Sequence, residues 1–187
     1  MNLDITREPA RIDAPVTDRR DAEIFFTTGE SALGTVLVAR SPRGICAILI
    51  GSQAGALTAD VAEQFPASAL MRNDHRLEDD LEKIIRFITA PERGLDLELD
   101  IHGTPFQRRV WDALCAIPCG RTVTYAALAR RIGEPGSVRA VANACAANAI
   151  ALAIPCHRVI RSDGTLSGYR WGIERMRALL AREALSQ

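Results

Sequence analysis

The first half of the chain alternates short apolar runs with turn-forming residues, a pattern that is typical of β-strands. Residues 34–40 and 44–50 are two such runs, and both are rich in β-branched side chains. Between them, Pro42 at the second position and Gly44 at the fourth suit a type I turn, so the two runs predict a β-hairpin. A shorter apolar run at 23–27 predicts another strand.

Apolar residues at helical spacing follow the predicted hairpin in the sequence. Residues 57–65 predict a short helix, and the apolar positions over 77–88 predict a longer amphipathic helix that ends near Pro91. Residues 95–101 alternate leucine or isoleucine with acidic side chains, which is the periodicity of a strand. Strands and helices in this order predict a small α+β domain over residues 21–100.

Helix start signals mark the second half of the chain. Thr104 and Gln107 have the spacing of a capping box, and Pro105 takes the first helical position, so a helix is predicted to run to about residue 116. A last helix is predicted over 173–185. It places four side chains near one face: Ile173, Met176, Leu180 and Glu183.

Two short helices are predicted between these. Thr124 is placed to cap a helix over 125–132, and Ser137 is placed to cap another that runs to about residue 147. The turn between them, residues 133–136, contains two glycines and a proline. This pattern is typical of a helix-turn-helix, although any corner between two helices has the same pattern.

Composition narrows the class of protein. With 48% hydrophobic and 25% charged residues, the 187-residue chain is typical of a globular protein with one large or two small domains. No apolar run reaches the roughly 18 residues of a membrane span, so no membrane partner is expected. Residues 1–20 are polar and lack a signal core, which predicts a flexible leader and a cytoplasmic protein. Five cysteines without a disulfide pattern favour a reducing compartment.

The net charge of zero conceals a division between the two halves. Residues 1–99 carry 17 acidic and 11 basic side chains, whereas residues 100–187 carry 6 acidic and 12 basic ones, a net charge of +6. All 12 of these basic residues are arginines, which favours a polyanionic partner. The alternative is a charged solvent face with arginine-biased codon usage, and Lys83, the only lysine, supports that explanation of the residue choice.

A cysteine next to a histidine is the clearest chemical signal. Cys156 and His157 follow an apolar run at 149–154. Sulfur attacks as a thiolate, and a neighbouring imidazole can generate one near neutral pH. The alternative is an inert buried cysteine. Because adjacent residues of a strand point to opposite sides, a working pair must lie in a turn or at a helix start.

Two polar residues upstream have two interpretations each. Arg139 lies near the start of a predicted helix whose other surface residues are small alanines, which would allow close approach to DNA or ordinary helix packing. Without further context, Arg139 is better interpreted as a solvated surface arginine. Asn148 is either a C-terminal helix cap or a clamp on the segment around Cys156.

Several short motifs in the second half follow one another in a characteristic order. They are Gly103-Thr104-Pro105-Phe106-Gln107, Val110-Trp111, Ile117-Pro118-x-Gly120-x-Thr122, Tyr125-x-x-Leu128-Ala129, Arg139-Ala140-Val141, Asn148 and Ile154-Pro155-Cys156-His157-Arg158-Val159. Together they resemble the O6-alkylguanine-DNA alkyltransferases, a family of direct-reversal DNA repair proteins. The resemblance is close over residues 100–187, and the segment 164–172 is most similar to the methyltransferase part of bacterial Ada proteins.

This resemblance implies a fold and an activity. The implied fold class is α+β, with a mixed α/β, ribonuclease H-like N-terminal domain followed by a mainly helical, winged helix-turn-helix domain over 101–187. The implied activity is irreversible, single-turnover transfer of an alkyl group from O6 of guanine, and from O4-methylthymine, in duplex DNA to Cys156. The protein would bind in the minor groove as a monomer, flip the damaged base and need no cofactor.

The resemblance also assigns roles to individual residues. Cys156 is the implied alkyl acceptor, His157 acts as base through a water, Glu183 orients the imidazole and Asn148 braces the turn. The implied DNA-binding residues are Tyr125, Arg139, Ala140, Val159, Ser162 and Tyr169. Arg139 would replace the flipped base in the stack, while Val159 and Tyr169 would line the guanine pocket or, alternatively, belong to the core.

Some positions depart from the family pattern. Met176 stands where many relatives have lysine, so any pocket role of that lysine is absent. Trp171 stands where some relatives have glycine, which implies a narrower pocket and weak acceptance of bulky O6 adducts. The four-cysteine zinc module of Ada is missing, and Cys115 and Cys119 lack partners at metal spacing, so no structural zinc is expected. His75 and His102 are interpreted as surface residues.

Three other functions compete with alkyl transfer. A lesion sensor that flips alkylguanine without repairing it would carry another residue at the acceptor position, and Cys156 argues against it. A transcriptional regulator is disfavoured by the missing zinc module. A cysteine hydrolase would need an oxyanion hole and catalytic turnover, which nothing in the sequence indicates.

Overall fold

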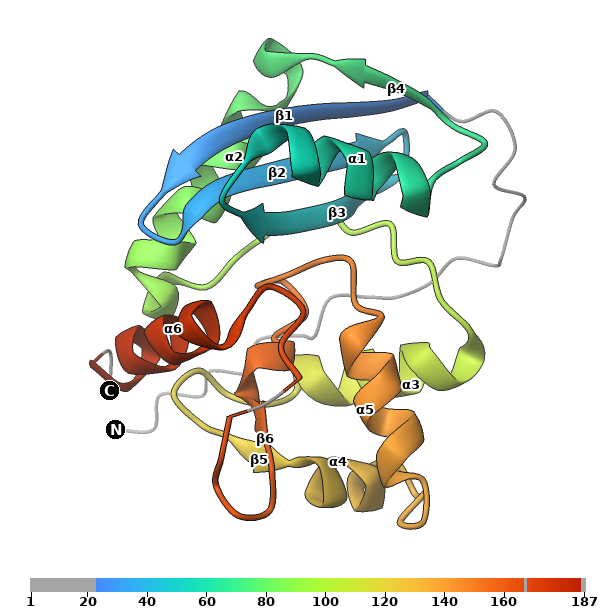
Figure 1. Cartoon of the computed structure of the whole chain (residues 1–187), viewed down its shortest axis with the longest axis vertical. Coiled ribbons are helices and arrows are strands. Elements are labelled where there is room, and N and C mark those ends of the chain that lie inside the picture. The colour runs from blue at the N-terminus through green and yellow to red at the C-terminus, as the bar shows by residue number, and fades with distance from the viewer. Residues whose placement is uncertain (1–22, 167, 186–187) are drawn as a thin grey trace, which may run out of the picture.

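The structure is a computed structural model that describes residues 23–166 and 168–185. The predicted leader at 1–20 therefore lies outside the described residues. A four-stranded sheet and two helices form the N-terminal part of the molecule, residues 23–100, and four further helices form most of the C-terminal part, residues 101–185 (Figure 1). This mixed α/β architecture agrees with the predicted presence of both element types.

The sheet has the strand order β3-β2-β1-β4. Its strands are β1 (Glu23–Ser31), β2 (Gly34–Ser41), β3 (Gly44–Gly51) and β4 (Ala69–Arg72). The predicted hairpin is confirmed as β2 and β3, which pair antiparallel with Ser41 opposite Gly44. The first strand is longer than predicted, and β4, which pairs parallel with β1, was not predicted because its four residues show no alternation of their own.

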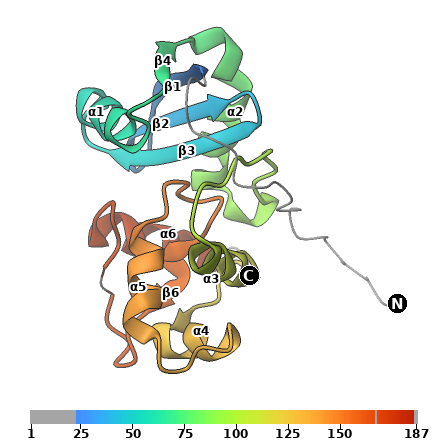
Figure 2. The same cartoon turned by 90° about the vertical axis from the view of Figure 1, so that its right-hand side faces the viewer.

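Two helices cover opposite faces of this sheet (Figure 2). The predicted short helix is α1 (Ala54–Gln64), and the predicted amphipathic helix is α2 (Asp74–Thr89). Both are confirmed. The side chain of Asn73 caps α2 by accepting a hydrogen bond from the Arg76 amide at 3.1 Å.

The strand predicted over 95–101 is wrong. After the short 3-10 helix η1 (Pro91–Arg93), the chain is extended but makes only one bridge, between Leu99 and Ile45 of β3. The Ile45 amide donates to Glu98 O, and the Asp100 amide donates to Ile45 O, both at 2.8 Å. The apolar and acidic residues alternate because the leucines pack against the core. The segment cannot extend its pairing along β3, because residues 149–151 form hydrogen bonds with Ile48 farther along the same edge.

The C-terminal part contains α3 (Pro105–Cys115), α4 (Tyr125–Arg131), α5 (Val138–Ala146) and α6 (Ile173–Leu185). The capping box of Thr104 and Gln107 is confirmed, as is the Thr124 cap on α4. Ser137 precedes α5 but does not cap it, because its hydroxyl lies 3.4 Å from the Glu134 carboxylate instead. Two short strands, β5 (Val123–Thr124) and β6 (Val159–Ile160), pair in parallel.

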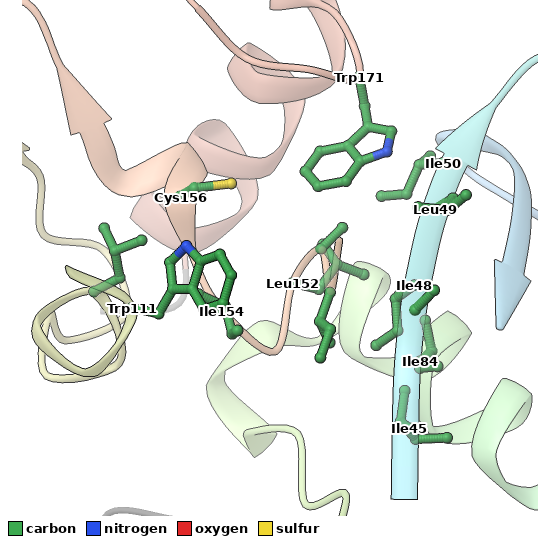
Figure 3. Packing of buried hydrophobic residues seen from close by; sticks show 14 of the residues in the cluster. Ile45, Ile48, Leu49, Ile50, Ile84, Trp111, Leu152, Ile154, Cys156 and Trp171 are labelled. Atoms are coloured by element: carbon green, nitrogen blue, oxygen red, sulfur yellow. The ribbon is translucent and has the colours of Figure 1, made fainter. Parts of the chain in front are cut away.

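The edge of β3 joins the two parts of the molecule. The Ile48 amide donates to Ala149 O at 2.9 Å, and the Ala151 amide donates to Ile48 O at 3.0 Å. Buried apolar residues on both sides form one continuous core (Figure 3). The apolar run before Cys156 is therefore held in place by the sheet. No described helix is long and apolar enough to cross a membrane.

Candidate active site

Cys156 begins a 3-10 turn, η2 (Cys156–Arg158), so the cysteine and the histidine avoid the opposed directions of strand neighbours. The thiol is buried, with 6% of the residue exposed. Just upstream, Leu152 adopts a φ of 70°, a left-handed conformation that is uncommon for a residue other than glycine. The surrounding contacts must hold this strained loop in place, as is typical of functional sites.

Asn148 supplies one of these contacts. Its side chain is fully buried, and its Nδ2 donates to Ile154 O at 2.8 Å and to Cys156 Sγ at 3.3 Å. Its Oδ1 accepts from the Ile150 amide at 2.9 Å. Asn148 therefore clamps the loop on both sides of Leu152, and Ala147 takes the position of the α5 C-cap.

His157 is oriented by Glu183. Nε2 of the fully buried imidazole lies 2.8 Å from Glu183 Oε1, across 26 positions of the sequence. A carboxylate only accepts hydrogen bonds, so Nε2 carries the ring proton and Nδ1 presents its lone pair. Nδ1 is also buried and makes no hydrogen bond to the described residues. The free lone pair is the basic position of the site.

Arg158 is a site residue to which the sequence analysis gave no role. Its guanidinium donates to Glu183 from Nε at 3.0 Å and from Nη2 at 2.8 Å, and its Nη1 donates to Ile117 O at 2.6 Å. The Gly120 amide also donates to Glu183, at 3.0 Å. A buried carboxylate such as Glu183 requires a positively charged partner. The position of Arg158 next to His157 was the sequence signal that could have identified it as this partner.

The pKa values of the three groups follow from these surroundings. Burial alone would raise the pKa of Glu183, but hydrogen bonds from His157 and Arg158 hold it at about 2. Burial lowers the pKa of His157 below 6.5 against the opposing effect of Glu183. Burial raises the pKa of the Cys156 thiol to about 11, despite the hydrogen bond from Asn148.

At neutral pH the site therefore holds a protonated thiol and a neutral imidazole. This differs from the expectation that the neighbouring imidazole would generate a thiolate near neutral pH. The physical reason is desolvation, which disfavours a resting ion pair of thiolate and imidazolium. The thiol must then lose its proton as it reacts rather than beforehand.

The remaining predicted site residues fall into an exposed group and a buried group. Arg139, Ala140 and Ser162 are exposed, and Tyr125 is half-buried. Val159 is fully buried in β6, as its core alternative requires. Tyr169 is also buried, and its ring stands edge-on to that of His157 with centroids 6.3 Å apart.

These exposed positions come from elements that gather at one end of the molecule. Helix α4, the start of α5 and the loop after β6 all lie at the end away from the sheet (Figure 1). Tyr125 approaches this loop, since a Cβ added at Gly168 would lie 3.3 Å from its hydroxyl. The exposed residues among the predicted DNA contacts therefore come from elements at this one end, whereas Val159 and Tyr169 are buried. The side chains of Cys156, His157, Glu183 and Asn148 are also buried.

Two smaller predictions differ in part from the structure. Of the four α6 residues predicted near one face, Met176 and Glu183 are buried and Leu180 packs against the core, but Ile173 is 41% exposed. His75 is exposed as expected, but His102 is largely buried and pairs with Asp100 at 3.0 Å. Within residues 23–166 and 168–185 no group of three His, Cys, Asp or Glu side chains could hold a metal ion, and the absence of zinc stays a prediction.

Comparisons with known proteins agree with this geometry. The family described as 6-O-methylguanine DNA methyltransferase, DNA binding domain, matches residues 105–185. The chain is 40% identical over 121 residues to the inducible methylated-DNA–protein-cysteine methyltransferase of Bacillus subtilis, covering 65% of this chain and 68% of that protein. The chain belongs to the methylated-DNA–protein-cysteine methyltransferase family.

Two other similarities extend over most of the chain. It is 50% identical over 161 residues to the bifunctional transcriptional activator/DNA repair enzyme Ada of Escherichia coli, covering 86% of this chain and 46% of Ada. The chain thus spans about half the length of this relative. The Mycobacterium tuberculosis OGT solved in complex with DNA has 34% identity and a TM-score of 0.73, covering 87% of this chain and 94% of that chain.

Proposed function

We propose that this protein repairs DNA by transferring an alkyl group, chiefly methyl, from O6 of alkylated guanine to Cys156. O4-methylthymine is proposed as a second substrate. The observation that carries the proposal is the buried Cys156 thiol beside a neutral His157, whose Nε2 is held by Glu183 at 2.8 Å. Membership of the family supports the same activity.

The transfer is a displacement at the alkyl carbon. Cys156 Sγ attacks that carbon, the bond from carbon to O6 breaks, and its electron pair stays on the guanine, which takes up a proton. The thiol proton passes through a water to His157 Nδ1, and Glu183 stabilises the imidazolium that forms. The product is a thioether with no leaving group to release it, so each molecule acts once.

DNA recognition is proposed for the exposed end of the C-terminal part. Helices α4 and α5 would act as a helix-turn-helix in the minor groove, with Tyr125 on a phosphate and Arg139 in the stack after base flipping. Ala140 permits close approach to the backbone, and Ser162 would contact a phosphate. The net charge of +6 over residues 100–187 supports a polyanion partner.

Replacing Arg139 with alanine tests this interface. We expect the rate of transfer from duplex O6-methylguanine to fall by roughly tenfold to a hundredfold, because the unstacked cavity is no longer filled. Transfer from a single-stranded oligonucleotide should change much less, since no base pair has to open. Arg177→Ala, which changes an exposed arginine of α6, is the control. Equal losses on both substrates would contradict the role of Arg139.

The pH dependence of transfer follows from the lowered pKa of His157. The base is active when neutral, so the single-turnover rate should be constant from pH 8 through pH 7. It should fall only below the ordinary histidine pKa of 6.5, as pH drops through the lowered value. A rate that already declines between pH 8 and pH 7 would show that another group supplies the base.

The proposal extends to the architecture. We propose a ribonuclease H-like domain over 21–100 and a winged helix-turn-helix domain over 101–187, with the extended segment after η1 as the boundary. The protein is proposed to act as a cytoplasmic monomer without a cofactor. The mixed sheet covered by α1 and α2 supports the first assignment, and α4 with α5 supports the second.

A titration of repaired DNA tests the function as a whole. Protein is mixed with increasing amounts of duplex carrying O6-methylguanine, and the guanine restored is counted after the reaction stops. The proposal requires repair to end at one guanine per protein molecule. No repair would leave a lesion sensor as the better explanation, and repair beyond one equivalent would indicate catalytic turnover.

A further inference from the structure

Arg175 joins the N-terminal part of the molecule to the loop that follows the active site. From α6, its Nε donates to Leu33 O at 2.7 Å, and its Nη1 donates to Trp171 O at 2.9 Å. The two acceptors are backbone carbonyls from segments 138 positions apart, one in the turn between β1 and β2 and one just before α6. The planar guanidinium holds both carbonyl oxygens in one fixed geometry.

The acceptor on the sheet is itself rigid. Leu33 is buried, and Gly34 follows it with a φ of 99°. A Cβ at Gly34 would lie 2.5 Å from Gly51 O and 3.3 Å from Arg175 Nη2. The guanidinium therefore lies closely against a turn that requires glycine, which leaves this end of the contact little freedom.

The other acceptor belongs to a residue next to the active site. Figure 3 shows the Trp171 indole between the Cys156 sulfur and Ile50 of β3. The Trp171 ring stands edge-on to Tyr169 with centroids 5.2 Å apart, and Tyr169 in turn stands edge-on to His157. The buried Trp171 indole, called the wall below, is thus connected through Tyr169 to His157, and Arg175 holds the backbone of this wall against the sheet.

We propose that Arg175 is a positioning residue that sets the size of the alkyl group Cys156 accepts. Arg175 is assigned no contact with the substrate, and no hydrogen bond links it to Cys156, His157 or Glu183 among the described residues. Releasing the Trp171 backbone would let the indole move away from the sulfur and admit a larger group. The inference rests on the proposed function and refines its substrate class to small O6 adducts.

Replacement of Arg175 by methionine is the direct test. Methionine removes both donors and keeps an aliphatic stem, and Arg175→Lys keeps the charge and one donor. Rates are measured for O6-methylguanine and O6-benzylguanine in the same duplex, with Arg177→Met as the matched control on the exposed face of α6. We expect the ratio of benzyl to methyl rates to rise about tenfold in Arg175→Met, less in Arg175→Lys, and not at all in the control.

An unchanged ratio of benzyl to methyl rates in Arg175→Met would overturn the inference. If the ratio is unchanged because both rates fall by the same factor, Arg175 has a purely structural role. All rates are normalised to the amount of protein that accepts a methyl group, so a partly unfolded sample does not change the ratio of benzyl to methyl rates. A wild-type protein that accepts no methyl group refutes the proposed function itself, which is a separate outcome.

A double-variant comparison keeps the test available if Arg175→Met does not fold. Trp171→Ala removes the wall directly and should raise the benzyl to methyl ratio by itself. Adding Arg175→Lys to that variant should then change the ratio no further, because the wall that Arg175 positions is gone. Independent, multiplicative effects of the two substitutions would contradict the proposal.

Discussion

A Glu183→Gln variant is expected to lose both stability and alkyl transfer. Glutamine keeps the size of the side chain but leaves the buried Arg158 guanidinium without its counter-ion, which costs about 3–5 kcal/mol of unfolding free energy. The amide can also donate to His157 Nε2, which forces the ring proton onto Nδ1. We expect single-turnover transfer to fall about 10²- to 10⁴-fold. Urea unfolding and rapid-quench kinetics measure the two effects.

Two further variants separate the effects. Glu174→Gln changes an exposed carboxylate on the same helix that pairs with Arg177, so both properties should stay near wild type. Arg158→Met combined with Glu183→Gln removes both buried charges and should regain part of the stability without regaining the rate. A normal rate in Glu183→Gln would show that the imidazole does not depend on Glu183.

The dependence of the unfolding free energy on acid pH tests the role of the Glu183 carboxylate independently. The folded-state pKa of Glu183 is depressed from 4.5 to about 2, so the unfolded chain binds this proton more readily. The stabilising contribution of Glu183 is therefore complete above about pH 4.5 and is lost as pH falls toward about 2. In Glu183→Gln this part of the acid dependence should be absent.

A Cys156→Ala variant is expected to bind damaged duplex with unchanged affinity and to transfer nothing. Binding is assigned to exposed residues such as Arg139, which the change leaves in place, whereas the only proposed nucleophile is removed. Cys145→Ala, another buried cysteine nearby in sequence, is the matched control and should transfer normally. Residual transfer by Cys156→Ala would move the acceptor to another side chain. Gel shifts and repair assays on the same samples measure both properties.

The parts of the fold predictable from the sequence depend on local interactions. The hairpin follows from two apolar runs and the turn between them, and α3 follows from Thr104, Pro105 and Gln107. The clamp by Asn148 and the contact between His157 and Glu183 were expected from the order of motifs rather than from any periodicity.

The parts that could not be predicted depend on partners distant in sequence. Strand β4 forms because β1 offers a free edge, and the segment at 95–101 fails as a strand because β3 pairs with it at Leu99 alone. The link from Ile48 to the loop before Cys156 has no local signal, since its two sides are about 100 positions apart. Arg158 was overlooked because the family resemblance assigned it no role, although it shares the partner Glu183 with His157.

The central claim is that Cys156 is the acceptor of the alkyl group, and peptide mass spectrometry tests it most directly. The protein is incubated with duplex carrying O6-methylguanine, digested with a protease and compared with an untreated sample. The account predicts a stoichiometric gain of one methylene, about 14 Da, on the peptide that contains Cys156 and on no other peptide. An unmodified Cys156 peptide after complete repair of the duplex, or methylation of another cysteine, would contradict it.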